Sequence, residues 1–143
     1  MSDFLADAVV AKLVAAGVGT LDTDIFVHPE VPPGTAGVPV DAIFVYSSDG
    51  FLPEAYIGNE KDFRRQWVEV RVRRRYDKYG EGSGDMTTIF NALHLRTLTL
   101  PTDYNFVWCR ATTSYATFVG ALNKENWLNW TQRFEIGIEF TNR

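Results

Sequence analysis

The longest regular pattern in the sequence is the alternation of apolar and polar residues over positions 130–141. A period of two is typical of a β-strand with one packed face and one polar face. At ~3.3 Å per residue this strand spans roughly 35–40 Å, which is long for a domain of this size. Its inward positions are predicted to be Phe134, Ile136, Ile138 and Phe140, and its outward positions Glu135, Gly137 and Glu139.

A second alternating segment covers residues 67–73, where valines at 68, 70 and 72 face one way and polar residues face the other. Three shorter runs rich in β-branched and aromatic residues are also predicted to be strands, at 23–28, 42–46 and 106–112. Together these segments predict a sheet of about five strands.

A first helix is predicted over residues 3–16, with Ser2 as its N-cap and glycines at 17 and 19 as its stop. Apolar residues cover more than half of its circumference, so it must lie against a sheet or another chain.

A second helix is predicted over about 85–95, after a glycine-rich turn at 80–84 and with Ser83 or Asp85 as its N-cap. Its apolar stripe follows the spacing i, i+3, i+4, i+7: Met86, Ile89, Phe90 and Leu93.

These segments predict an α+β fold in the order α-β-β-β-α-β-β. It consists of a predominantly antiparallel sheet of about five strands with two helices packed on one face. A length of 143 residues fits a single domain over 1–143. A Pro/Gly loop is expected at 29–40 and an irregular segment at 49–65.

Composition restricts the compartment and the class of partner. The single cysteine, Cys109, has no partner for an internal disulfide, and no run approaches the ~20 apolar residues of a membrane helix. The N-terminus lacks the pattern of a secretion signal, so we expect a protein made or assembled in the cytosol. Aromatic residues reach 14%, a surplus that favours an interface.

A net charge of −4 conceals a strong separation of charge along the chain. Residues 1–60 hold one cation against nine carboxylates, whereas residues 61–78 hold eight cations against three carboxylates. Such a separation gives opposite potentials to different elements of the surface.

Sites for phosphate or metal are not supported by the spacing of the residues. The glycine-rich turn at 80–84 lacks the residues of a dinucleotide loop or P-loop, and its two nearby carboxylates would repel a phosphate. His28, His94 and Cys109 lack the short paired spacings of zinc ligands, and Cys109 is expected to be a small core residue. We therefore expect no cofactor and no metal.

The paired carboxylates Glu135 and Glu139 share a strand face but would lie about 13 Å apart. Glycosidase carboxylates need roughly 5–9.5 Å, so we expect these two to pair instead with Arg71 or Arg73 across strands. No catalytic residue is assigned, and the chain is not expected to be an enzyme.

The densest charge cluster consists of Arg71, Arg73, Arg74 and Arg75. A nucleic-acid interface is one interpretation, because aromatic residues lie nearby. The acidic pI of about 5.1 instead favours a cationic surface that meets the acidic N-terminal part of another copy. The candidate interface or lumen residues are these four arginines with Asp22, Asp24, Asp41, Glu135 and Glu139.

The order of segments resembles the tail terminator (tail completion, or minor capsid) proteins of long-tailed bacteriophages. The resemblance covers most of residues 40–143 and, more loosely, the first helix. It rests on DAIFVY at 41–46, VEVRVR at 68–73, IFNAL at 89–93, FVWCR at 106–110 and the long alternating strand at 130–140. Two features depart from the resemblance: the arginine cluster is denser than we expect for that family, and we cannot place the insert at residues 51–65.

The resemblance implies a homo-oligomeric ring, usually a hexamer, that caps the tail tube and joins it to the head-side connector. Genome DNA would pass through its lumen, and no catalytic residues carry over. The protein would be assembled in the host cytoplasm and reside in the tail or neck of the virion, with no membrane partner.

Three alternatives stay open. A phage neck or head-completion protein would share these features. A cone-shaped α+β ligand-binding protein or small enzyme would need a deep cavity lined by His94 or Asp103. A nucleic-acid-binding module would use residues 71–75 and show binding that falls steeply with salt.

Overall fold

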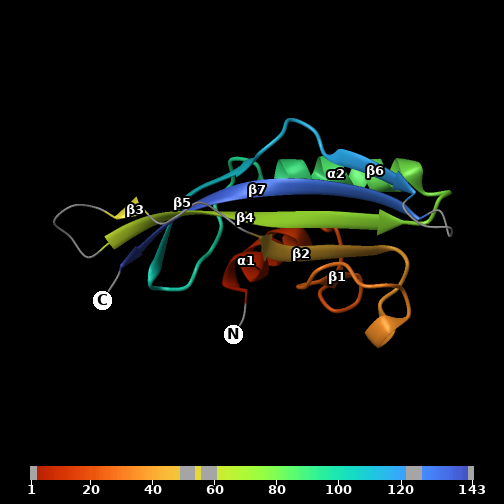
Figure 1. Ribbon diagram of the computed structural model, residues 1–143, viewed down its shortest axis with the longest axis horizontal. Coiled ribbons are helices and arrows are strands. Elements are labelled where there is room, and N and C mark those ends of the chain that lie inside the picture. The colour runs from red at the N-terminus through yellow and green to blue at the C-terminus, as the bar shows by residue number, and fades with distance from the viewer. Residues whose placement is uncertain (1–2, 49–53, 56–60, 122–126, 142–143) are drawn as a thin grey trace.

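The computed structural model describes residues 3–48, 54–55, 61–121 and 127–141 (Figure 1). Its elements in chain order are α1 (Phe4–Ala15), β1 (Ile25–Phe26), the 3-10 helix η1 (Thr35–Gly37), β2 (Ala42–Ser48), β3 (Glu54–Ala55), β4 (Lys61–Arg74), α2 (Tyr79–Leu93), β5 (Tyr104–Ala111), β6 (Thr117–Ala121) and β7 (Leu128–Thr141). The predicted α+β class and order of elements are confirmed, and β3 and β6 are short additional strands.

All the described strands form one sheet with the order β1-β2-β4-β7-β5, in which β3 pairs with β4 and β6 pairs with β7. The central pair is β4 and β7, which run antiparallel from Lys61 opposite Thr141 to Arg74 opposite Leu128. Of the named strand pairs only β1–β2 is parallel. Figure 1 shows β4 and β7 extending along the length of the molecule, with the helices behind them.

Both helices cover the inner face of the sheet, where α1 contacts β2 and α2, and α2 contacts β4 and β7. The valines predicted to face inward are fully buried in this core. Burial of each large apolar side chain contributes about 1.5–3 kcal/mol. The core brings together residues from both helices and the central strands: Leu5, Val9, Leu13, Val68, Val70, Val72, Ile89, Leu93, Phe134, Ile136 and Ile138.

The N-cap of α1 is Asp3, whose Oδ1 accepts a hydrogen bond from the Ala6 amide at 3.1 Å. The predicted cap, Ser2, lies outside the described residues. Asp3 also accepts hydrogen bonds from Ser47, from the amide at 2.7 Å and from the hydroxyl. The Asp3 carboxylate therefore caps the N-terminus of α1 and links the helix to the C-terminal end of β2.

Helix α2 begins six residues earlier than predicted, so the glycine-rich segment 80–84 is helical rather than a turn. The helix N-cap is Lys78, without a side-chain cap, and the predicted caps Ser83 and Asp85 are wrong. Glycine is a poor helix former, but Gly82 is buried against Trp130, where a Cβ would lie 2.2 Å from the indole ring unless the packing shifts. Tertiary packing thus overrides the local preference.

Strand β4 begins at Lys61, so the prediction of an irregular segment at 49–65 is wrong for its last five residues. Residues 49–53 and 56–60 lie outside the described part of the chain. The apolar–polar alternation of β4 is not visible at this end of the strand, because the charged Arg64 occupies an inward position. Its guanidinium packs over the Phe140 ring, 4.7 Å from the ring centroid. On the outer face Phe63 lies 5.1 Å from Trp108.

Residues 29–40, the predicted Pro/Gly loop, connect β1 to β2 and include η1. Val31 and Val38 pack against Phe26, Ala42 and Phe44 in a second, smaller core on the outer face of β1 and β2. Among the described residues, no helix is both long and apolar enough to cross a membrane.

Candidate assembly surfaces

Arg73, predicted to be an interface or lumen residue, is buried with an exposed fraction of 1%. Its guanidinium donates to the carbonyls of Val40 at 2.9 Å and Pro39 at 2.8 Å, to the carbonyl of Val31, and to Glu30 at 3.4 Å. Burial lowers the pKa of Arg73 from its ordinary value, and the Glu30 carboxylate opposes this shift. The expectation that Arg73 lies on the surface is therefore wrong, because its side chain organises the loop.

The other three arginines of the cluster each lie beside a carboxylate of the same chain. Arg71 contacts Glu30 at 3.5 Å, and Arg75 contacts Asp41 at 3.5 Å. Arg74 donates from Nε to Asp85 Oδ2 at 2.9 Å and also through Nη2. Burial raises the pKa of Asp85, and the hydrogen bond from Arg74 counteracts it. The four arginines of the cluster thus face three carboxylates of their own chain.

The predicted acidic partners lie near the start of β1 and β2. The Asp41 carboxylate accepts a hydrogen bond from the backbone amide of Arg75 at 2.9 Å and also lies 3.5 Å from the Arg75 guanidinium. Asp24 accepts from the Thr20 amide at 2.6 Å, and Asp22 occupies a left-handed turn with φ of 64°. Asp41 and Asp24 therefore have local structural roles, and whether any of the three faces another copy stays a prediction.

Glu135 does not pair with Arg71 or Arg73, contrary to the prediction. The register of β4 and β7 places Arg71 opposite Thr131 and Glu135 opposite Trp67. Glu135 Oε1 instead accepts from Arg110 at 2.7 Å and 3.1 Å, and from the Trp108 indole at 3.1 Å, both on β5. The outward Glu139 accepts from Asn105 of β5 at 3.4 Å.

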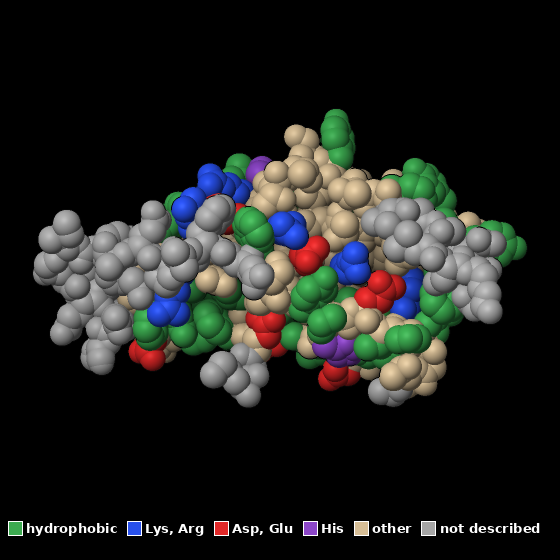
Figure 2. Space-filling view, in the orientation of Figure 1, with side chains coloured by type: hydrophobic (Ala, Val, Ile, Leu, Met, Phe, Trp, Pro, Cys, Tyr) green, Lys and Arg blue, Asp and Glu red, His purple; other side chains and the backbone are tan. Residues whose placement is uncertain are grey.

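The outer face of the sheet carries arginines stacked on tryptophans. The Arg133 guanidinium lies 4.4 Å from the centre of a Trp67 ring, and Arg110 lies 4.8 Å from a Trp108 ring. Figure 2 shows blue and red groups interspersed over this face rather than separated into patches. A mixed surface of this kind provides specific contacts for a protein and no continuous track for a nucleic-acid backbone.

The two histidines lie in different parts of the fold and have different partners. His28 lies beside Phe26 and Phe44, whereas His94 Nδ1 accepts from the Ala111 amide at 3.0 Å. No group of three or more potential ligands that could hold a metal occurs among the described residues. Cys109 is buried as predicted, and burial raises the pKa of its thiol to about 12.

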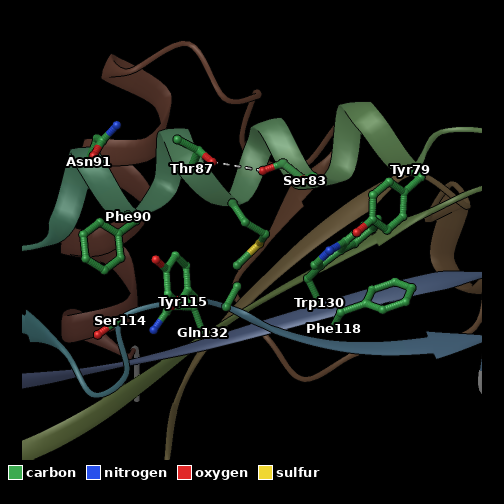
Figure 3. Close-up of a pocket in the computed structure, with 12 residues that line it drawn as sticks. Tyr79, Ser83, Thr87, Phe90, Asn91, Ser114, Tyr115, Phe118, Trp130 and Gln132 are labelled. Atoms are coloured by element: carbon green, nitrogen blue, oxygen red, sulfur yellow. Dashed lines mark hydrogen bonds between the residues drawn. The ribbon is translucent and has the colours of Figure 1, made fainter.

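An aromatic groove lies between α2 and the β5–β6 connection, over β6 and β7, with a volume of about 390 Å³ (Figure 3). Tyr79, Phe118 and Trp130 form a cluster at one end, with ring centres 5.2–5.7 Å apart. Phe90 and Tyr115 lie toward the other end in Figure 3. Tyr115 is 84% exposed, a large value for an aromatic side chain.

The residues that line this groove include no carboxylate, histidine, lysine, arginine or cysteine. Neither His94 nor Asp103, which the small-enzyme alternative requires, is among them. The groove can therefore bind apolar surface and donate or accept a few hydrogen bonds, but it lacks the paired ionisable groups of acid–base catalysis. No local sequence pattern marks this groove, although the aromatic surplus of 14% is a signal for it.

No family model matches the sequence, and no curated protein does. Among solved structures, the fold is similar to a chain of the structure described as the virion of a native gene transfer agent (GTA) particle. The TM-score is 0.68 at 16% sequence identity, and the match covers 94% of each chain. At this identity the likeness establishes a shared fold over nearly the whole of both chains.

Proposed function

We propose that the chain is a structural protein of a phage-like virion, and that within the virion it acts as a tail terminator. The observation that carries this proposal is the fold similarity to a virion component across 94% of both chains. A match over the full length includes the order and packing of all the major elements, which a shared fragment would not. The order of segments in the sequence resembles the tail terminator family independently.

The chemistry of the surfaces supports an assembly role over an enzymatic one. The groove lacks ionisable groups apart from tyrosine, and the outer face of the sheet carries interspersed charges. The internal ion pairs of Arg71, Arg74 and Arg75 reduce the potential available for tight binding of DNA. DNA must move through the lumen of such a ring, so the lumen should not bind DNA tightly.

In this role residues 1–143 act as one domain, and copies of the chain form a closed ring, with a hexamer expected. The ring binds the tail tube on one side and the head-side connector on the other. Assembly takes place in the host cytoplasm, and the finished protein lies at the junction of tail and head.

The test is to purify the protein and measure its mass by native mass spectrometry, alone and with tail-tube subunits. Negative-stain images of the mixture should show rings at the end of tubes. A chain that stays monomeric and ignores the tube subunits at all concentrations would overturn the proposal. Binding to connector subunits but not to tube subunits would instead identify a neck or head-completion protein.

A further inference from the structure

Each of the two edges of the sheet carries an exposed leucine just outside its last named strand. At the β1 edge, Leu21 forms a parallel bridge with Ile25 and is 47% exposed. At the β5 edge, the backbone amide of Leu95 donates to the carbonyl of Cys109 at 2.7 Å, and Leu95 is 72% exposed. Because β1 and β5 are the two ends of the strand order, these leucines lie at opposite edges of the sheet.

Each leucine is followed by a charged residue, and the two charges have opposite signs. Asp22 follows the first leucine and Arg96 follows the second, and both residues are exposed. The Arg96 Nε donates to the carbonyl of Asn91 at 3.3 Å. Within the described part of the chain, neither Asp22 nor Arg96 takes part in an ion pair. The two edges therefore differ from the arginine cluster at 71–75, whose charges face carboxylates of the same chain.

Both edges also contain a residue other than glycine in the left-handed region of the backbone. The angle φ is 64° at Asp22 and 60° at Leu95, and no other described residue apart from glycines has a positive φ. An aspartate adopts this region readily, whereas a leucine does so at a cost in free energy. Leu95 is thus held in an unfavourable backbone conformation with its apolar side chain exposed. Burial of that side chain by another chain would offset the cost.

The charges identify the surface that can cover each edge. When the leucines of the two different edges are buried against each other, the carboxylate and the guanidinium beside them can form an ion pair across the contact. Contact of either edge with itself would bring two copies of Asp22, or two copies of Arg96, close together, and like charges in contact are unfavourable. A second copy of the chain is therefore complementary to each edge through its opposite edge.

We infer that the β5 edge of one copy, at Leu95 and Arg96, binds the β1 edge of the next copy, at Leu21 and Asp22. This inference rests on the proposed ring and specifies the contact that closes it. The contact is heterologous, and repetition of a heterologous contact gives a closed ring when the rotation permits. Burial of one leucine strengthens binding roughly tenfold or more, whereas an exposed ion pair contributes less than about fivefold. The leucines thus supply most of the affinity, and the charges select which edges meet.

Cysteine crosslinking tests which edges meet. Thr23→Cys places a thiol at the β1 edge and Thr97→Cys places one at the β5 edge, and both threonines are exposed. Ser83→Cys is the matched control, because Ser83 is exposed but lies about 15 Å along the helix axis from the end of α2 that leads to the β5 edge. The native Cys109 is buried and gives little background reaction. Variants are mixed in pairs, assembled and treated with a short bismaleimide, and the products are separated on a denaturing gel.

The expected result is a crosslinked dimer when Thr23→Cys and Thr97→Cys copies are mixed, and a ladder of multimers when both cysteines are in one chain. Pairs that contain Ser83→Cys should crosslink several-fold less. Strong dimers from either edge variant alone would show that like edges meet and would overturn the inference. Rings that give no crosslink between the two edge variants would do the same.

Substitution of Leu95 separates assembly from folding. Leu95→Asn removes the apolar side chain but introduces a residue that adopts the left-handed region readily, so the thermal unfolding temperature of the unassembled chain should not fall. The concentration at which half of the protein is in rings should rise at least about tenfold. Leu95→Met keeps an apolar side chain of similar volume and should change this concentration by less than about threefold. A folded Leu95→Asn variant that assembles like the wild type contradicts the inference.

A double-mutant cycle tests the ion pair across the contact. Asp22→Asn and Arg96→Gln should each raise the half-assembly concentration about two- to fivefold, and the double variant should show little further increase. Asparagine is chosen because it also tolerates the left-handed backbone at position 22. Effects that simply multiply in the double variant would mean that the two charges do not meet. Rings that form normally in the Leu95→Asn variant and in both charge variants overturn this inference and leave the proposed function standing. A wild-type chain that never assembles overturns both.

Discussion

Gly82 of α2 lies directly against the indole ring of Trp130, and a Cβ at position 82 would come within 2.2 Å of the ring carbons Cζ3 and Cη2. The same tryptophan forms one wall of the aromatic groove. The glycine therefore sets how closely α2 approaches β7, and with it the width of the groove.

Gly82→Ala should destabilise the protein by roughly 1–3 kcal/mol, because α2 must shift away from Trp130. Gly84→Ala is the matched control in the same helix, since nothing lies within 4 Å of a Cβ there. Alanine at that position should stabilise by up to about 1 kcal/mol through helix propensity. Urea unfolding of the two variants measures the difference, and equal stabilisation of both would contradict the packing.

Arg73→Met should destabilise the protein by about 3–5 kcal/mol, because it leaves Glu30 and three loop carbonyls without their buried donor. Arg75→Met is the control, since its side chain is 63% exposed, and the change should stay within about 0.5 kcal/mol. Equilibrium unfolding of both variants compares them. Similar stabilities would mean that Arg73 does not organise the loop.

Asp3→Ala should cost about 2 kcal/mol, because the variant loses the N-cap of α1 together with the hydrogen bonds from Ser47. Asp7→Ala, in the first turn of the same helix, should cost less than about 1 kcal/mol, because Asp7 acts only through the helix dipole. A double-mutant cycle of Asp3→Ala and Ser47→Ala then measures the coupling between helix and strand. Additive effects would exclude the contact between the two side chains.

The thiol of Cys109 should be alkylated by iodoacetamide at pH 8.5 roughly three orders of magnitude more slowly in the folded protein than in urea. Only the thiolate reacts, and burial raises the pKa of the thiol from its ordinary value of 9.0 to about 12 in the folded protein. Mass spectrometry of quenched samples follows the reaction. Comparable rates in the folded and unfolded chain would show that the thiol is accessible.

The same pKa shift predicts the direction of a pH effect on stability. The folded state holds the Cys109 proton more tightly than the unfolded state, so unfolding releases it. The contribution is fully present below about pH 9 and is lost as the pH rises toward about 12. Cys109→Ala should remove this part of the decrease in the free energy of unfolding at alkaline pH. A pH profile of unfolding free energy identical to that of the wild type would contradict the prediction.

Sequence alone was sufficient for the elements whose signal is local. The alternation at residues 130–141 and at Val68, Val70 and Val72 predicted both strands and the face that packs against the helices, but not the burial of Glu135 on the opposite face. The apolar spacing in α1 predicted that helix to within one residue at each end. A period of two or of 3.6 is present in the chain before it folds, because it depends only on neighbours in sequence.

Tertiary contacts decided what the local pattern could not. Arg64 belongs to a strand paired with β7, where its guanidinium lies over Phe140, 76 positions away, and within the helical segment 80–84 Gly82 packs on Trp130. Arg73 is buried because the loop at 29–40 folds over it. The groove combines α2, the β5–β6 connection and β7. Strand register and the packing of distant segments place these groups together, and neither has a signature within a short window of sequence.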